Sequence, residues 1–574
     1  MRNYIVNLPP ENIPDFAMHQ PDTTPRHSLY FDYQVFPAAP LPAESVAAAP
    51  VVGVGAGPIG LALALDLARH GVRVVLLTAG QQVSEGSRAI VFTRRSLEIL
   101  QQVGADSALV EQGLPWRFGS SFYRGQAVFR LEAPHDPHDR YAPMNNLQQQ
   151  VLEASMLALI ARQPLIEMRW GHLVTGIAGD ENEAMLTVDT PHGAYTQRAS
   201  WVVACDGARS SLRQLQGLAL EGESWQGRFV IADIKIDLPL PTERLAFFDP
   251  AWNPGNTVLM HREPFGIWRI DYQLPPDETP EEALQPASLA ARINAQLQSI
   301  GFGETPWTMD WSSVYSARAL SLADYVHERV IYCGDAAHLL PIFGVRGANT
   351  GLQDAQNLGW KLAAHVQGKA PVALVQSYST ERVAAAREIV AEAGKSTRFM
   401  TPPTPGFRLL RDATLSLALT ETFVRPLMHW RTSRPHEYLH SPLNSDDDDS
   451  PQFSHGPAPG AVMRSVRLAA DHYLLDESQP GFTLLIFSDH PVSPEVRGAA
   501  EQWRAQGGLL VILTLPRSAA DGEAWARYGV DADGAAYLLR PDQHVCARWL
   551  RLAPDRLLRA LARAMALTTP EKEA

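Results

Sequence analysis

A chain of 574 residues is longer than one hydrophobic core can serve, and it predicts about three domains. Its 45% hydrophobic and 19% charged residues are ordinary globular values and exclude general disorder. A formal net charge of −13 argues against surfaces that bind nucleic acid or an anionic membrane, so we expect neither as a partner.

The chain opens with a segment, residues 1–48, that is rich in proline and polar groups and has little periodicity. It predicts an extended arm rather than a domain, and it lacks the apolar run of a secretory signal. The long apolar run at residues 50–68 is broken by glycines, Pro58 and Asp66, which does not suit a membrane helix. We therefore expect a cytoplasmic protein.

Residues 51–77 read as strand, glycine-rich turn, helix and strand, which is a βαβ unit. Gly55, Gly57 and Gly60 form GxGxxG between the first strand and the helix. In this context the motif lets the backbone approach a dinucleotide pyrophosphate at the helix N-terminus, and the alternative is a purely structural turn. The second strand ends at Thr78, where such sites carry an acid for the ribose hydroxyls, so either Thr78 makes a weaker bond or another group takes that place.

The rest of residues 49–228 alternates between helix and strand. We predict helices near residues 93–103 and 149–162 and strands over 185–204. The alternation returns over residues 316–400, and the two segments together predict one α/β domain of the Rossmann type.

Short strands separated by proline-rich turns occupy residues 229–315, with one helix near 288–299. This pattern predicts an inserted β-sheet domain. Residues 401–440 read as helical. The prolines and the acidic run of residues 441–460 predict a linker of solvated chain.

The last segment, residues 461–574, has the pattern βαβ, hairpin and helix, which is thioredoxin-like. Its predicted strands are Phe482–Phe487, Leu509–Leu515, Ala535–Leu539 and Val545–Leu550, followed by a helix from Pro554. The segment contains no CxxC, so we expect packing or assembly, including a homodimer, rather than dithiol exchange.

The three cysteines, Cys205, Cys333 and Cys546, lie far apart in the sequence. No disulfide scaffold, zinc cluster or dithiol centre is predicted from them, and we predict no metal site. This use of cysteine fits a reducing cytosol.

Four segments, taken in order, resemble the flavoprotein aromatic hydroxylases, the family that includes para-hydroxybenzoate hydroxylase and phenol hydroxylase. They are GAGPIG at 55–60, GSRAIVFTRRSLEIL at 86–100, ACDGARSSLR at 204–213 and GDAAHLLPIFGVRGANTGLQDAQNLGWKLA at 334–363. The C-terminal segment resembles that of the longer phenol-hydroxylase branch. The resemblance implies an α/β fold with a Rossmann-like FAD-binding domain, an inserted substrate-binding sheet and a C-terminal thioredoxin-like domain.

The resemblance implies which residues hold FAD. Asp335 matches an acid that binds a ribityl hydroxyl, and its alternative use is to cap the next turn. Gly347, Ala348 and Asn349 open a helix whose N–H groups would face the flavin N1 and C2 carbonyl, where reduced flavin carries negative charge. The implied set is completed by Pro58 in the glycine-rich turn, Arg88 near the pyrophosphate, Gln149 near the ribose, and Asp206 and Gly207 near both FAD and the nicotinamide donor.

These matches leave alternatives open. Arg88 and Gln149 also suit surface positions, and CDGARSS suits a plain strand-to-helix turn. Pro341 matches a proline that borders the flavin beside the substrate, but Ile342, Val345 and Arg346 depart from the family pattern. Arg346 suits either an anionic ligand or a solvated surface. We read His338 as a packed residue rather than a base.

The resemblance implies that NADPH or NADH reduces FAD, that O2 adds to form a C4a-hydroperoxide, and that the distal oxygen passes to a small phenolic substrate. A phenol has to lose or share its proton first, which requires a general base. No residue is identified for this role, and the catalytic candidates are Pro341, Tyr315 and Arg269. Tyr123 and Tyr315 also read as core packing.

Other functions fit the same fold. A tryptophan-type halogenase is disfavoured, because it would show WxWxIP, whereas residues 306–313 read PWTMDWSS. A reductase that does not activate oxygen stays as an alternative, and so does a non-catalytic nucleotide-binding protein.

Overall fold

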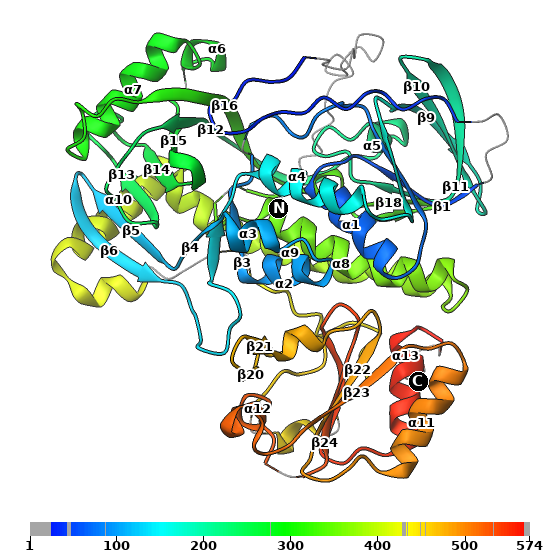
Figure 1. Cartoon of the computed structure of the whole chain (residues 1–574). Coiled ribbons are helices and arrows are strands. Elements are labelled where there is room, and N and C mark those ends of the chain that lie inside the picture. The colour runs from blue at the N-terminus through cyan, green and yellow to red at the C-terminus, as the bar shows by residue number, and fades with distance from the viewer. Residues whose placement is uncertain are drawn as a thin grey trace.

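The computed structural model describes residues 24–42 and 48–567, apart from residues 87, 276, 342, 428–431, 433, 448, 454 and 532. Most of the predicted arm and Ile342 therefore lie outside the described residues. Figure 1 shows an α/β part built on β1, β11 and β18 beside a second part built on β12 to β16, with the C-terminal α/β part below both. Within the described residues, no helix is both long and apolar enough to cross a membrane.

The first sheet is mostly parallel and buried. Its strands, in spatial order, are β17 (Val326–His327), β18 (Val330–Tyr332), β11 (Gly193–Ala204), β1 (Ala49–Val54), β2 (Val74–Thr78) and β8 (Ile166–Trp170). β9 (Leu173–Gly179) and β10 (Ala184–Thr190) extend it from β11 as an antiparallel hairpin. Val51, Val52 and Leu77 have no exposed surface, as a parallel sheet covered on both faces requires. The predicted βαβ unit is confirmed, with α1 (Pro58–Arg69) between β1 and β2.

Smaller elements follow the first βαβ unit. The predicted helices near 93–103 and 149–162 are α2 (Arg94–Gln102) and α4 (Gln149–Ile160). The others are β3 (Val91–Thr93), β4 (Leu114–Trp116) and β7 (Met144–Asn146), which form a small sheet, with α3 (Ser107–Glu111) and α5 (Ser211–Leu215).

The second sheet contains the strands predicted as an insertion, β12 to β16, and three more. Its order is β19 (His338–Leu339), β16 (Thr308–Ser321), β12 (Glu221–Lys235), β15 (Ile267–Gln273), β14 (Thr257–Arg262), β13 (Arg244–Phe248), β5 (Phe118–Tyr123) and β6 (Gln126–Glu132). β5 pairs in parallel with β13, so the sheet draws on residues before the predicted 229–315 insertion. α7 (Pro286–Ser299), which follows the short α6 (Pro280–Ala283), lies where a helix was predicted and packs its buried Leu289, Ile293 and Leu297 into the core of this sheet (Figure 1).

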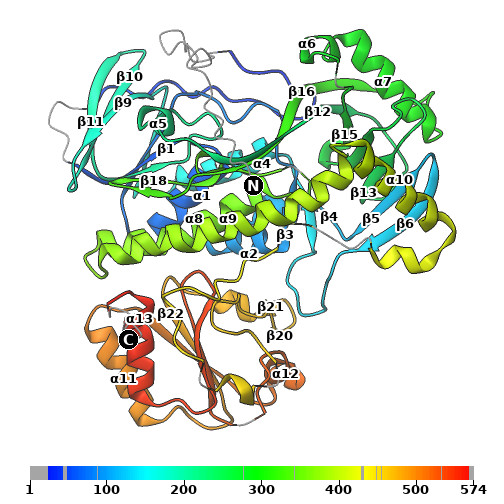
Figure 2. The same ribbon diagram turned by 180° about the vertical axis from the view of Figure 1, so that it is seen from behind.

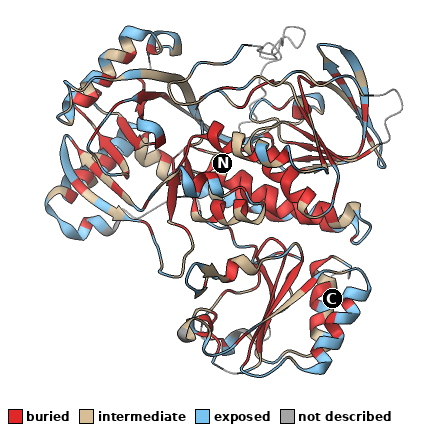
Figure 3. Ribbon diagram, in the orientation of Figure 1, coloured by how far each residue is buried: buried red, intermediate tan, exposed pale blue. Residues whose placement is uncertain are grey.

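Long helices connect the two sheets. α8 (Gly347–Val366) lies against α1 beneath the first sheet, and its core residues are buried (Figure 3). Figure 2 shows α9 (Val372–Met400) running from the first sheet toward the second, where α10 (Pro405–Thr420) continues the helical path beside β5 and β6.

The described part of the arm, residues 24–42, contains no helix or strand, as predicted. It links the two sheets along one side of the molecule. The Arg26 guanidinium donates to the carbonyl of Val83 at 2.8 Å, and the Ser28 hydroxyl donates to Asp310 on β16 at 2.9 Å.

The C-terminal part is a separate α/β sheet of order β23 (Leu510–Leu515), β22 (Phe482–Phe487), β24 (Ala535–Leu539) and β25 (Val545–Trp549). Its strands lie where the sequence predicted them. The helices are α11 (Pro494–Ala505), α12 (Glu523–Arg527) and α13 (Pro554–Ala564). A two-stranded sheet, β20 (Arg467–Ala469) and β21 (His472–Tyr473), precedes it.

Two members of the acidic run, Asp447 and Asp449, are bound to the C-terminal sheet, which corrects the expectation of solvated chain. Arg548 on β25 donates to both carboxylate oxygens of Asp447, at 2.6 Å from Nη2 and 3.0 Å from Nε. Asp449 accepts from the backbone N–H of Leu550 at 3.0 Å. Because these arginines and amides belong to the C-terminal sheet, the acidic run is part of that body.

A buried ionic cluster joins the C-terminal part to α8 and α9. Arg540 donates to the Glu381 carboxylate at 2.6 and 3.1 Å, and it also pairs with Asp542. Lys361 on α8 donates to the same Glu381 at 2.6 Å. Burial would raise the pKa of Glu381, but Arg540 and Lys361 hold it below its usual range. Glu381 is therefore charged although it is buried, and its charge depends on Arg540 of the C-terminal part.

Arg540→Met is expected to reduce stability strongly, because it leaves the Glu381 carboxylate and Asp542 without their main cation. Removing one partner of such a buried pair costs about 3–5 kcal/mol. Chemical denaturation of the variant and the wild type measures the change.

Arg559→Met is the matched control in the same body. Arg559 pairs with Asp555 at 2.6 Å, but the two side chains are 69% and 64% exposed, so little change is expected. Equal unfolding curves for Arg540→Met and Arg559→Met would contradict the role given to the cluster.

Candidate functional site

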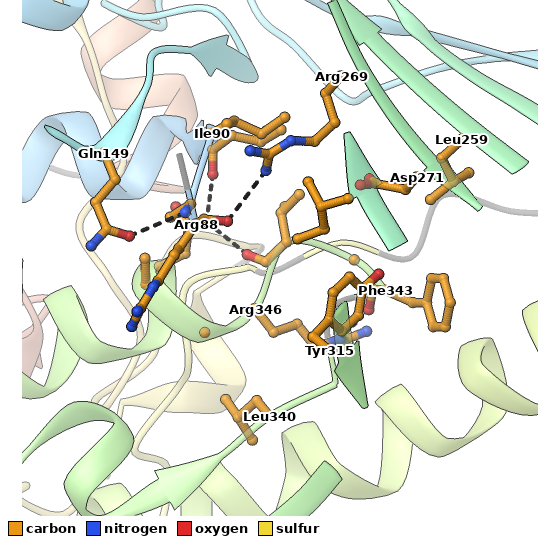
Figure 4. A pocket seen from close by; sticks show the side chains of 18 of the residues that line it. Arg88, Ile90, Gln149, Leu259, Arg269, Asp271, Tyr315, Leu340, Phe343 and Arg346 are labelled. Carbon is orange, nitrogen blue, oxygen red and sulfur yellow. Dashed lines mark hydrogen bonds between the residues drawn. The ribbon is translucent and has the colours of Figure 1, made fainter. Parts of the chain in front are cut away.

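A cavity of about 1310 Å³ lies between the two sheets. On one side it is lined by the turn after β1, the segment after β18 and the start of α8. On the other side it is lined by side chains of β12 to β16 (Figure 4). The carboxyl ends of parallel strands are where α/β sheets bind ligands, so the position agrees with the fold.

The glycine-rich turn forms one end of the cavity. Gly55 has φ +105°, and a Cβ on it would lie 2.3 Å from the carbonyl oxygen of Cys205. A Cβ on Gly60 would lie 2.0 Å from the carbonyl oxygen of Gly55. A Cβ on Gly57 would meet nothing within 4 Å, and no side chain caps the helix there. The turn therefore offers space and uncapped N–H groups to an anion.

Asp206 and Gly207 line the same end of the cavity, after β11. One oxygen of Asp206 accepts from the backbone N–H of Leu212 at 3.2 Å and from the Ser211 hydroxyl at 3.1 Å, so it organises the start of α5. The Oδ1 atom is buried and has no hydrogen-bond partner within the described part of the chain. Burial raises the pKa of this carboxyl. Asp206 thus holds the start of α5 with one carboxylate oxygen, while its Oδ1 oxygen lacks a hydrogen-bond donor.

Asp335 extends into the cavity. Its side chain is accessible there and accepts no hydrogen bond from the residues that the structure describes, so the turn-capping alternative has no bond to support it. The surrounding protein raises the pKa of its carboxyl by desolvation. Gly347 and Ala348 line the cavity nearby. Asn349 lines it too, but its side chain bonds the backbone of Thr93 and Val91 at 2.8 and 2.9 Å and so anchors α8.

Arg88, in the loop after β2, and Gln149, at the start of α4, line the cavity (Figure 4). Gln149 accepts from the N–H of Ala89 at 3.1 Å and donates to the buried carboxylate of Glu153 at 2.8 Å. Thr78 does not line the cavity, and its carbonyl accepts from the N–H of His172 at 2.8 Å. Thr78 is therefore not brought together with the other predicted site residues.

The predicted residues around Pro341 have different environments. Pro341 is buried but does not line the cavity. Arg346 lines it and is only 5% exposed, so the reading as a solvated surface arginine is wrong. His338 is fully buried and bonds Asp354 at 2.6 Å, which agrees with its reading as a packed residue.

Two rows of side chains lie on the face of the second sheet, and the sequence did not predict that they come together. Paired positions place Trp311, Asp233, Arg269 and His261 in one row. The next row consists of Ser313, Ile231, Asp271, Leu259, Ala246 and Ser121. Arg269 and Asp271 are two residues apart and point to the same face. This period-two spacing is the signal in the sequence that could have placed Asp271 beside Arg269. Only the pairing of β15 with β14 shows that His261 lies on the same face.

Arg269, a predicted catalytic candidate, lies in a buried ion pair. It donates to both oxygens of Asp233 at 2.8 Å, and its Nε lies 3.5 Å from Glu263. Burial opposes its charge, but Asp233 and Glu263 raise its pKa above the ordinary value. The arginine contributes a fixed positive charge to the wall.

Asp271 and Tyr315 project into the cavity without partners (Figure 4). Asp271 Oδ1 and the Tyr315 hydroxyl are buried and make no hydrogen bond with the described residues. Burial raises the pKa of Asp271 to about 7, and it raises the pKa of Tyr315 well above the ordinary value. Burial, with Arg244 and Arg269, lowers the pKa of His261 to about 3. The wall therefore contains a carboxyl poised near neutrality.

Two cysteines that are distant in the sequence meet beside the glycine-rich turn. Cys205 and Cys333 line the cavity, and both are reduced. Burial and the neighbouring Cys205 thiol raise the pKa of Cys333 well above its ordinary value. Among the described residues, no cluster of three or more His, Cys, Asp or Glu side chains could hold a metal ion.

Comparisons with known proteins agree with this architecture. The family model described as FAD binding domain matches residues 48–393. A 3-(3-hydroxy-phenyl)propionate/3-hydroxycinnamic acid hydroxylase of Mycolicibacterium smegmatis is 28% identical over 480 residues, which cover 82% of each chain. The corresponding hydroxylase of Paraburkholderia xenovorans is 30% identical over 348 residues, which cover 60% of this chain and 54% of the relative.

Solved structures share the fold. The flavin-dependent monooxygenase PieE, in complex with FAD and substrate, has a TM-score of 0.76 at 22% identity, over 91% of this chain and 100% of its own. Aklavinone-11 hydroxylase, with FAD and aklavinone, has a TM-score of 0.72 at 22% identity, over 90% and 99%.

Asp271→Asn is expected to stabilise the protein above neutral pH. The pKa of Asp271 rises from 3.8 to about 7 on folding, so the folded state holds this proton more tightly. The penalty of burying its charge is absent at low pH, grows as the pH rises between these values and is complete above about 7. It amounts to about 1.4 kcal/mol for each unit of the shift.

Thermal melting at pH 5 and pH 8 measures this effect. The variant should melt above the wild type at pH 8, with a smaller difference at pH 5. Asp237→Asn, which changes an exposed carboxyl after β12, should show no such trend. A lower melting temperature for Asp271→Asn at pH 8 would contradict the buried-charge argument.

Proposed function

Because the chain belongs to the FAD binding domain family and is a flavin-dependent aromatic hydroxylase, we propose that its substrate is a phenol with an acidic side chain. O2 supplies the oxygen atom, and the reductant is NADH or NADPH, as is typical of such hydroxylases. The observation that carries the proposal is one cavity that joins the glycine-rich turn to a polar sheet face. The reductase and non-catalytic alternatives find no support among the hydroxylases to which the chain is related.

The residues of the cavity fit FAD. The space beside Gly57 and the uncapped start of α1 suit a pyrophosphate, and the unbonded Asp335 carboxylate suits a ribityl hydroxyl. The N–H groups at the start of α8 suit the negative charge of a reduced flavin ring. Arg88, Gln149, Asp206 and Gly207 complete the proposed set, as lining residues of the same cavity.

Thr78 and Pro341 are the weakest members of the predicted set, because neither lines the cavity. Asn349 supports the site by holding α8 in place. Bound FAD supplies the redox chemistry and the activation of O2. The chain's own residues bind it, enclose the substrate and manage the phenolic proton.

Arg244 on β13 suits the acid group of the substrate. Its guanidinium lines the cavity on the sheet face, and burial lowers its pKa to about 10, so it is still a cation at neutral pH. Arginine binds carboxylates through a planar fork of donors. Two relatives are named for 3-(3-hydroxy-phenyl)propionate and 3-hydroxycinnamic acid, which are phenols of this kind.

The C-terminal part supports a second, structural proposal. We infer that residues 461–574 form a thioredoxin-like domain, supported by β22 pairing in parallel with β23 and antiparallel with β24. The other predicted boundaries are proposed with two changes: β5 and β6 join the substrate domain, and the acidic run joins the C-terminal part. A homodimer and a cytoplasmic location stay predictions.

Gly57→Ala is expected to weaken FAD binding without unfolding the protein. The added methyl group has room in the protein alone, but it occupies the space next to the turn's N–H groups. We expect the dissociation constant of FAD to rise at least about tenfold, an effect of about 1.4 kcal/mol. Gly60→Ala should lower the melting temperature as well, since its Cβ would meet the Gly55 carbonyl. If Gly57→Ala binds FAD with the wild-type affinity, the assignment of the glycine-rich turn to the pyrophosphate is wrong.

A substrate screen tests the proposed function. Phenols with and without a carboxylate side chain are compared for hydroxylated product formed per O2 consumed and NAD(P)H oxidised. Phenolic acids should give the highest ratio of hydroxylated product to O2 consumed. Arg244→Met should raise KM for them by about 10- to 100-fold, the loss expected for a charged hydrogen bond, and leave neutral phenols unaffected. Equal coupling of neutral and acidic phenols by the wild type would overturn the substrate class.

A further inference from the structure

We propose that Asp271 is the general base that removes the phenolic proton of the substrate, an assignment that rests on the proposed function. Asp271 lies in the middle of β15 on the face of the second sheet that lines the cavity. Its paired neighbours, Ile231 and Leu259, are apolar and offer it no hydrogen bond. Asp271 lines the cavity, and its buried Oδ1 atom has no hydrogen-bond donor among the described residues.

Arg269, the nearest cation along the strand, does not neutralise this oxygen. Its Nε and Nη2 atoms donate to the two oxygens of Asp233, and its Nη1 atom donates to the carbonyl of Arg88 at 3.4 Å. Arg269 lowers the pKa of Asp271 through space, whereas burial and Asp233 raise it, and the result is a value of about 7. A carboxyl with such a pKa is partly ionised near neutral pH and holds a proton more tightly than an ordinary carboxylate, which suits a general base.

The other titratable groups of this wall fit the role less well. The Tyr315 hydroxyl is held neutral, because its pKa lies well above the ordinary value. His261 has a pKa of about 3, so its imidazole is a weak base. Asp233 is bonded through both oxygens to Arg269. Geometry and basicity therefore select the same carboxylate.

The charged and titratable groups around Asp271 come from both walls of the cavity. They are Arg228 and Asp233 on β12, Arg244 on β13, His261 on β14, Arg269 on β15, Tyr315 and Arg318 on β16, Cys205 and Asp206 after β11, Cys333 and Asp335 after β18, Arg346 before α8, Lys395 on α9, and Glu85 and Arg88 in the loop after β2. Of these, Arg269 and Asp233 act most directly on Asp271.

The step is a simple proton transfer. The O–H bond of the phenol breaks, its proton bonds to a carboxylate oxygen of Asp271, and the electron pair stays on the phenol oxygen. The ring becomes more electron-rich and reacts faster with the electrophilic oxygen that the established activity provides. The carboxylic acid returns its proton to the product oxygen or to water, so no further reactant is needed.

Asp271→Asn tests the assignment in the complete FAD-loaded enzyme. The substrates are phenolic acids of equal shape whose ring substituents lower the phenol pKa stepwise. With ordinary phenols at pH 7.5, we expect hydroxylation to fall by about 10²- to 10⁴-fold, the usual contribution of a general base. With the most acidic phenols, already ionised in solution, the variant should recover to within a few-fold of the wild type.

The pH profile gives a second readout. The wild-type rate should rise with pH and level off above about 7, because the carboxylate is the active form. In Asp271→Asn the rise should move to the pKa of the phenol itself. A purely structural role would lower the rate equally for all phenols and leave the profile in place. That result would overturn the proposal.

Controls separate this assignment from the proposed function. Asp237→Asn, the exposed carboxyl change, should retain the wild-type rate and profile. If the wild type hydroxylates no phenol, the proposed function fails; if it does and Asp271→Asn matches it, only the base assignment fails. If Asp271→Asn does not bind FAD, Asp271→Ala is assayed with and without added formate, which should restore activity, and absence of rescue would count against the base.

Discussion

One buried carboxylate, Asp354 on α8, holds the cavity wall in place. It accepts from Arg382 on α9 at 2.5 Å, from His338 at 2.6 Å and from the N–H of Gly334 at 3.2 Å. Burial would raise its pKa, but Arg382 and His338 keep it below the ordinary value, so the charge persists. Because Gly334 and His338 flank Asp335, this group fixes the segment that presents Asp335 to the cofactor space.

Much of the cofactor half was readable from sequence because its signals are local. The glycine turn, the strand before it and the helix after it lie within one short stretch, and a Cβ on Gly55 or Gly60 would meet backbone whereas Gly57 leaves space. Asp335 and the start of α8 were implied by the family resemblance, and both line the cavity. Thr78 does not line the cavity. The sequence shows where the second strand ends, but it does not show how far that end lies from the cavity.

The part of the cavity lined by the second sheet could not be predicted from the sequence, because its residues are brought together by the pairing register of several strands. Period-two spacing puts Arg269 and Asp271 on one face, but only strand pairing adds His261 and Leu259 to it. Parallel pairing of β5 with β13 has no local signature at all. The same limit explains the acidic run, whose partner Arg548 lies a hundred residues further along the chain.

The ionic cluster around Glu381 also bears on how such chains are assembled from parts. Lys361 and Glu381 belong to one body and Arg540 to another, yet all three are buried as a unit. Separation would break the Arg540–Glu381 pair and expose the apolar surface that packs around Trp360. The C-terminal body is thus no detachable module: any exchange between relatives has to carry the arginine and its carboxylate partners together.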